Sequence, residues 1–202
     1  MPLKFANNQS LTSTTALPSA VPTDNLILIS TQTASSSANI SFTTGINSTY
    51  DEYIFKFINI HPSTTADFTF NMSTDGGSNY NVTKTTTFFR TYHDEADTTT
   101  SLGYRTDSDL AQSTGFQHIC YDLTTTSDES CSGSLSLFNP ASTTYVKHFI
   151  GSSNFMQLNT YQTNAYFAGY GNTTSAINAV QFKMSSGNID DGIIKLYGVK
   201  KS

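Results

Sequence analysis

The chain has no tryptophan, few charged residues and no long apolar segment, and these shortages exclude several classes of function. Charged residues make up 12% of its 202 positions, about half of their usual share. Its 10 Lys and Arg against 15 Asp and Glu give a net charge of -5 without a basic stripe, so binding of nucleic acid through phosphate neutralisation is not expected. Apolar runs such as Leu26–Ile29 are far shorter than the roughly 20 residues that span a bilayer, so no membrane association is expected.

Signal and disulfide patterns are also missing. Met1–Ser10 contains one lysine and no apolar stretch, so we predict synthesis in a cytosol without a signal peptide. The two cysteines, Cys120 and Cys131, are too few for a disulfide framework, and no Cys/His spacing is typical of zinc. A hairpin turning at Thr125-Thr126 would bring them face to face and allow a cross-strand disulfide. Cytosolic synthesis favours two reduced thiols instead.

What the chain has in quantity is hydroxyl groups and aromatic rings. Ser and Thr fill 59 positions and Asn another 16, a polar bias that often accompanies disorder. The 14 Phe and 11 Tyr supply enough aromatic area to drive collapse. The composition therefore predicts a folded, neutral, aromatic-rich domain.

Apolar residues recur with a period of two in short runs, which is typical of β-strands. In Asp67–Ser73, for example, Phe68, Phe70 and Met72 share one face. Strands are predicted at Leu26–Thr31, Asn39–Thr43, Glu52–Ile60, Asp67–Ser73, Tyr80–Thr83, Thr85–Tyr92, Phe116–Leu123, Cys131–Phe138, Thr144–Ile150, Thr163–Gly169, Ile177–Met184 and Gly192–Val199. A polar acidic loop is predicted at His93–Ser101, and a short helical turn competes at Asp107–Thr114.

The run Glu52–Ile60 has apolar residues on both faces. Tyr53, Phe55 and Phe57 lie on one side, and Ile54, Ile58 and Ile60 lie on the other. This pattern indicates a central strand that is covered on both sides, or one whose environment changes along its length.

Short strands at regular spacing without crossover helices predict an all-β fold, a single antiparallel β-sandwich of jelly-roll type over residues 26–202. Residues 1–25 differ, because they carry only isolated apolar side chains and cannot build a core. They are interpreted either as a frayed terminus or as an extended arm that docks on a neighbouring subunit. The apolar residues of this arm are Phe5, Leu11, Leu17 and Val21.

No pattern of catalytic or metal-binding residues stands out. The loop His93–Asp97 is rich in possible cation ligands but lacks the order and the glycine of a calcium loop, so we interpret it as solvated. The carboxylates lie mainly in turns, which disfavours the facing pair of a glycosidase. His118 and His148 fall inside predicted strands and are interpreted as structural. We therefore expect no enzyme activity, no cofactor and no metal.

The C-terminal part carries a family resemblance. Gly169–Gly192, GYGNTTSAINAVQFKMSSGNIDDG, is followed by Ile194–Val199, IKLYGV, and together they resemble the C-terminus of virion structural proteins of marine tailed phages, such as cyanophages. Tyr50–Pro62 and Asp75–Tyr80 resemble the same group, so the similarity covers Leu26–Val199. The resemblance implies a component of the virion that is made in the host cytoplasm.

Within the virion, we expect a capsid decoration or cement protein that contacts the major capsid protein and assembles as a homotrimer. In this interpretation, the arm grips the shell or a neighbour. Burial of its four apolar side chains would contribute roughly 1.5–3 kcal/mol for each large side chain. The absence of coiled-coil heptads favours this placement over a fibre shaft.

The alternative is a tail-fibre or tail-tip module that adheres to glycans of the host surface. Exposed tyrosines in loops would suit this role, because tyrosine offers a stacking face and a hydroxyl. The residues considered are Tyr161, Tyr166, Tyr170 and Asn172. The competing interpretation is that these tyrosines pack along strand edges. A polysaccharide depolymerase is a third hypothesis.

Overall fold

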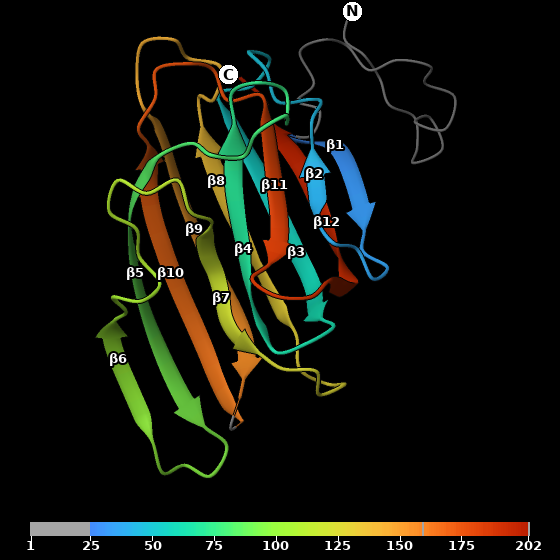
Figure 1. Cartoon of the computed structure of the whole chain (residues 1–202), viewed down its shortest axis with the longest axis vertical. Coiled ribbons are helices and arrows are strands. Elements are labelled where there is room, and N and C mark those ends of the chain that lie inside the picture. The colour runs from blue at the N-terminus through green and yellow to red at the C-terminus, as the bar shows by residue number, and fades with distance from the viewer. Residues whose placement is uncertain (1–24, 159, 202) are drawn as a thin grey trace, which may run out of the picture.

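The computed structural model describes residues 25–158 and 160–201, which form twelve β-strands and no helix (Figure 1). The strands are β1 (Leu26–Thr33), β2 (Ile40–Phe42), β3 (Glu52–Pro62), β4 (Ala66–Ser73), β5 (Lys84–Asp94), β6 (Thr100–Tyr104), β7 (Gln117–Leu123), β8 (Cys131–Phe138), β9 (Lys147–Gln157), β10 (Tyr161–Gly171), β11 (Ala179–Met184) and β12 (Ile189–Val199). The predicted all-β class is confirmed. Within the described ranges no helix could cross a membrane. Residues 1–24 of the predicted arm, with all four of its apolar residues named above, lie outside them.

The strands form two antiparallel sheets of unequal size. The larger has the order β1-β12-β3-β8-β9-β10-β5-β6, and the smaller has the order β2-β11-β4-β7. In Figure 1 the smaller sheet lies in front of the larger one, while β6 and the adjoining end of β5 extend beyond it. One sheet therefore overhangs the other.

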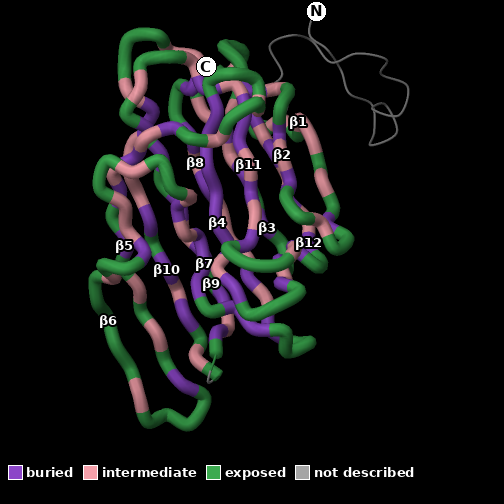
Figure 2. Tube along the Cα trace, in the orientation of Figure 1, coloured by how far each residue is buried: buried purple, intermediate pink, exposed green. Residues whose placement is uncertain are grey.

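The core lies between the two sheets and is mainly aromatic. The Phe182 ring of β11 packs edge-on against Phe57 of β3 at 5.3 Å, and Phe70 of β4 packs edge-on against Phe149 of β9 at 5.1 Å. Such edge-to-face contacts suit the ring quadrupoles. Figure 2 shows β4 almost entirely buried and β6 mostly exposed. The inward alternation predicted for Phe68, Phe70 and Met72 is confirmed.

The two-sided pattern of Glu52–Ile60 has a local cause. Tyr53, Phe55 and Phe57 face the core, whereas Ile58 is exposed on the opposite face. Asn59 has a φ of 50°, and the pairing of β3 with β8 shifts between Phe57 and Ile60. This bulge turns Ile60 back into the core, where it is fully buried. The strand therefore changes environment along its length and is not covered on both sides.

Three local predictions are wrong. Tyr80–Thr83 is not a strand, and β6 occupies part of the predicted polar loop. Asp107–Thr114 contains no helical turn. It runs beside β5, because its backbone makes hydrogen bonds there, including Lys84 N to Ser113 O at 2.8 Å. These long-range bonds outweigh a weak local helical preference.

The cysteine prediction is also wrong. Cys120 and Cys131 form a disulfide, with Cα atoms 6.8 Å apart. They do not lie on a hairpin, because β7 belongs to the smaller sheet and β8 to the larger one. The chain between these strands crosses from one sheet to the other. The symmetric spacing does bring the cysteines together, but the bond joins the two layers of the sandwich.

Candidate functional site

The uncovered face of the larger sheet, here called the outer face, is the most distinctive surface of the described residues. The opposite face of the larger sheet is covered by the smaller sheet over most strands. Successive side chains of β8, β9, β10 and β5 therefore point alternately into the core and outward. The pairing places His148, Tyr170 and Thr85 side by side on this face. The next row is Ser136, Ile150, Ala168 and Thr87, and the row after it includes Ser134, Ser152, Tyr166, Phe89 and Tyr104.

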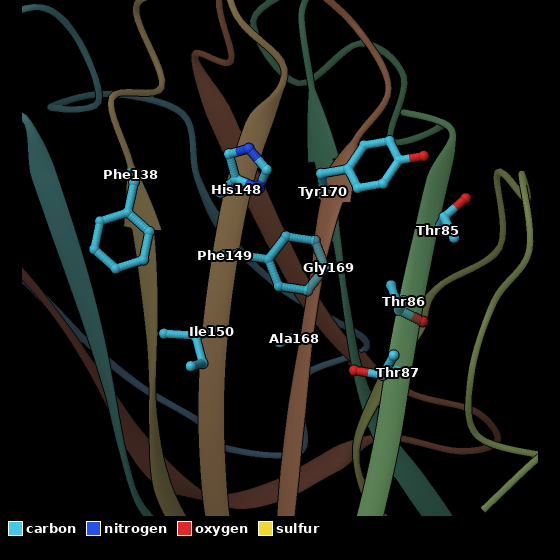
Figure 3. Close-up of a pocket in the computed structure, with 10 residues that line it drawn as sticks. All are labelled: Thr85, Thr86, Thr87, Phe138, His148, Phe149, Ile150, Ala168, Gly169 and Tyr170. Atoms are coloured by element: carbon cyan, nitrogen blue, oxygen red, sulfur yellow. The ribbon is translucent and has the colours of Figure 1, made fainter.

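Three adjoining hollows lie over these rows, and we call them together the outer groove. The central hollow has a volume of about 490 Å³ and is lined by Thr85–Thr87, Phe138, His148–Ile150 and Ala168–Tyr170 (Figure 3). A hollow of about 500 Å³ shares Phe138 and His148 and adds Asn139, Ser142, Thr144, Tyr145, Val146 and Thr174. A third, of about 240 Å³, shares Ile150 and adds Ser134, Ser136, Gly151, Ser152 and Tyr166. The shared residues make the three hollows one surface.

The lining of the outer groove is uncharged and mixes aromatic rings with hydroxyl groups. None of its lining residues is Asp, Glu, Lys or Arg. Tyr145 is 70% exposed, Ile150 55% and Tyr166 42%, which are large fractions for apolar and aromatic side chains. Figure 3 shows Tyr170 extending from β10 toward Thr85 on β5. A surface of this kind can offer stacking faces and neutral hydrogen bonds.

The structure places the tyrosines of the adhesion hypothesis on β10 and not in loops. Tyr166 stacks on Phe89 of β5, with ring centroids 5.1 Å apart and planes inclined by 15°. Tyr170 lies beside His148, at 6.2 Å. Both contribute to the outer groove. Tyr161 shares the inward parity of the buried residues of β10 and packs against Tyr92 at 5.1 Å, so it is not part of the groove.

Asn172 follows β10 and does not line the groove either. Its Nδ2 donates to Gln112 Oε1 at 2.8 Å, and its backbone N donates to Thr83 O at 2.7 Å. These bonds attach the end of β10 to neighbouring loops. Sequence reasoning missed most of the groove, because Phe138, Tyr145 and Ile150 come together only when β8 and β9 are paired and the loop between them is placed.

A buried lysine fixes that loop. Lys147 is fully buried, and its Nζ donates to Tyr145 O at 2.6 Å and to Thr173 O at 3.3 Å. Burial lowers the pKa of this amine. Since both acceptors belong to chain segments beside the groove, Lys147 positions the backbone that carries Tyr145.

In the predicted acidic loop, the carboxylate of Asp94 accepts hydrogen bonds from the loop itself. Oδ1 of Asp94 accepts hydrogen bonds from the backbone N of Thr98 and of Thr99, at 2.8 Å each. The hydrogen bond from the Thr98 hydroxyl, followed by these backbone bonds, lowers the pKa of Asp94. His93 Nε2 lies 3.1 Å from Asp97 Oδ1. Residues 25–158 and 160–201 contain no group of three or more His, Cys, Asp or Glu that could hold a metal ion.

A Ser-His-Asp grouping forms among the described residues, but its serine is buried. Ser108 Oγ lies 3.2 Å from His118 Nδ1, and His118 Nε2 lies 3.8 Å from Asp67 Oδ2. Ser108 is only 3% exposed, and its oxygen also accepts from Arg105 Nε at 3.0 Å. Burial is the main cause that lowers the pKa of His118. The grouping is a partly buried polar network that joins β4, β7 and the segment after β6.

A scan of protein-family models, a search of curated proteins and a search of solved structures each find no match to the chain.

Proposed function

We propose that the chain is a non-enzymatic structural protein on the virion of a tailed bacteriophage. The observation that carries this proposal is the outer face, where large uncharged side chains are left uncovered. Exposed apolar patches mark surfaces that bind a protein partner or another ligand. The resemblance of Leu26–Val199 to phage virion proteins supplies the setting. The two segments with the strongest resemblance form β11, β12 and the end of β10.

We infer further that the sandwich is a jelly roll enlarged by two hairpins. In a jelly roll, strands one, eight, three and six form one sheet, and strands two, seven, four and five form the other. When β5–β6 and β9–β10 are taken as insertions, the remaining orders are β1-β12-β3-β8 and β2-β11-β4-β7, which fit this scheme. Viral capsid and lectin domains use this architecture, an analogy that supports a virion role without deciding it.

The preferred placement is on the head, as a trimeric decoration or cement protein beside the major capsid protein. The measurement that tests it is the copy number per virion, by quantitative mass spectrometry against the major capsid protein. A number comparable with that of the capsid protein supports decoration. A small fraction of that number contradicts decoration and places the chain on the tail.

The predicted arm offers a second test of decoration. A truncated chain without residues 1–25 should lose binding to capsids that lack the protein, because Phe5, Leu11, Leu17 and Val21 would no longer be buried at the shell. Co-sedimentation with such capsids, beside the full chain, measures this loss. Equal binding by the two chains contradicts the role of the arm.

A second candidate function is adhesion to the host as a tail-fibre or tail-tip module. The specific observation in its favour is the outer groove, in which Tyr166 and Tyr170 are accessible beside hydroxyl groups. The depolymerase hypothesis gains no support from the groove, because no carboxylate is among its lining residues. Release of reducing sugar from host envelope material would contradict the non-enzymatic proposal.

A further inference from the structure

We propose that the outer groove binds a neutral polysaccharide, whose chain follows the three hollows over the outer faces of β8, β9, β10 and β5. The inference rests on the second candidate function, adhesion to the host, because it takes the ligand from a host surface. The binding itself can be measured with the isolated protein.

The shape suits an extended ligand. The hollow beside Tyr145 shares Phe138 and His148 with the central hollow, and the central hollow shares Ile150 with the one beside Tyr166. Three adjoining hollows give successive units of a polymer separate places to lie. A compact small molecule would occupy one hollow only, and small-molecule sites are usually deeper.

The chemistry of the lining matches sugars. Sugar rings present hydroxyl edges and faces of C–H groups, so they are bound by hydroxyls that both donate and accept and by exposed aromatic rings. Thr85 and Thr87 of β5 and Ser136 of β8 supply hydroxyls, and Tyr166 of β10 supplies a ring. A neutral ligand is favoured because no charged residue lines the groove, although Lys56 is the cross-strand neighbour of Ser134 at its border.

The same lining disfavours a protein partner. The cores of protein–protein interfaces are enriched in aromatic residues, Met and Arg, and they are depleted in Ser. Here the third hollow contains Ser134, Ser136 and Ser152, and the loop hollow contains Ser142. Burying these hydroxyls against apolar side chains would leave some of them without hydrogen bonds, which is costly. Sugar hydroxyls would satisfy them.

Both ends of the groove are held in place before a ligand arrives. Tyr166 is stacked on Phe89, and the backbone that carries Tyr145 is bound by the buried Lys147. Ordering side chains on binding costs free energy, so a prepared surface binds more tightly than a mobile one. Each sugar contact therefore loses less of its binding free energy to the ordering of the surface.

The position of the groove in the fold also points to a binding role. Most of its lining comes from β5, β9 and β10, which are the strands that our jelly-roll inference treats as additions. These strands widen only one of the two sheets. Their inward side chains belong to the core, as the contact of Phe149 with Phe70 shows, but their outward side chains take no part in it. Their outward side chains therefore build a surface more than they complete a sandwich.

The test uses the full chain and a defined panel of polysaccharides: a glucan, a mannan and a galactan as neutral probes, and an alginate and a sulfated galactan as anionic probes. Affinity electrophoresis or calorimetry should detect binding to at least one neutral probe. That binding should be nearly unchanged between low and high salt, because no ion pair is involved.

Variants locate the binding to the groove. Tyr166→Ala should weaken it about tenfold by removing one stacking face. Ile150→Glu, at an exposed position, should abolish it by placing a charge in the centre. Leu28→Ala is the matched control, because Leu28 is 52% exposed on the distant strand β1. This variant should bind the polysaccharide as the parent does. Circular dichroism checks that each variant is folded.

Three results would overturn the proposal. The first is binding to none of the neutral probes, and the second is salt-sensitive binding to anionic probes only. The third is neutral binding that Tyr166→Ala and Ile150→Glu leave unchanged. Loss of capsid binding in these variants, without any glycan binding, would identify the groove as a protein interface instead. The copy number per virion is unaffected by any of these results, so the proposed function stands or falls separately.

Discussion

At the scale of single residues, the core contains a primary amine without an acidic partner. Lys84 is fully buried on β5, and its Nζ donates to Asn71 Oδ1 at 2.5 Å and to Val82 O at 2.7 Å. Among the described residues no carboxylate forms an ion pair with it. Burial therefore lowers the pKa of Lys84 from its ordinary value of 10.5 to about 7. Folding removes a proton that the unfolded chain would keep.

This shift predicts the direction of a pH effect on stability. Between pH 7 and pH 10.5 the unfolded chain binds more protons at Lys84 than the folded chain, so the free energy of unfolding should rise with pH. The slope should approach about 1.4 kcal/mol for each pH unit. Urea unfolding between pH 7 and pH 9 measures it, within that window.

The matched variant is Lys84→Met, which keeps the length of the side chain and removes the titrating group. Asn71 Oδ1 still accepts from the backbone N of Met72 at 2.8 Å. The variant should show a flatter profile, in which Lys147 still contributes a rise because burial also lowers its pKa. It should be at least as stable as the parent at pH 7. Parallel profiles would mean that Lys84 keeps its proton in the folded protein.

At the scale of elements, the pairing of β3 with β12 depends on an irregular pair of residues. Asn59 and Gly192 both have positive φ, at 50° and 125°, and the register shifts on either side of Asp191. A Cβ at Gly192 would lie 2.8 Å from Asn59 O and from Ile60 Cα. Both atoms are backbone, so the neighbour cannot move aside without disturbing the bulge.

We therefore expect Gly192→Ala to lower the free energy of unfolding by about 2 kcal/mol or more, from backbone strain together with the close contact. Gly103→Ala on β6 is the control, because its Cβ would meet nothing within 4 Å and its φ is not positive. The control should change stability by less than about 0.5 kcal/mol. Equal effects of the two substitutions in urea titrations would contradict this explanation.

Elements also show how far the sequence can be interpreted alone. Strands such as β4 and β11 were predictable because their apolar residues alternate and one face is buried. The strand β6 was not, since Thr100–Tyr104 is exposed along its whole length and leaves no apolar pattern. The outer groove depends on which strands are neighbours, and no periodicity encodes that order. Only Tyr166 and Tyr170 of the groove were identified beforehand.

At the scale of the whole molecule, the two sheets are joined by packing and by one covalent bond. The smaller sheet ends at β7, and the larger one continues through β8 to the strands of the outer groove. Cys120 on β7 and Cys131 on β8 are bonded across the core. A bond at this place holds the edge of the smaller sheet against the middle of the larger one, beneath the strands that carry the groove.

A disulfide also bears on where the protein acts. Such bonds persist in oxidising surroundings and are rare in the cytosol. A virion protein is made in the cytosol and then spends most of its existence outside the cell, so the bond could form after release. The pairing of Cys120 and Cys131 is therefore compatible with the proposed location on the virion.

The last prediction concerns this bond. In virions, alkylation without reductant should leave both cysteines unmodified, and reduction should raise the mass of the chain by about 2 Da.

The bond closes a loop of 11 residues, so the double variant Cys120→Ala, Cys131→Ala should lose about 3 kcal/mol of unfolding free energy. The parent under reducing conditions should fall by a similar amount, while the double variant should not respond to reductant. Alkylation of both thiols in untreated virions would contradict the pairing. In that case the two sheets are held together by their aromatic core alone, and the parent should be as stable with reductant as without it.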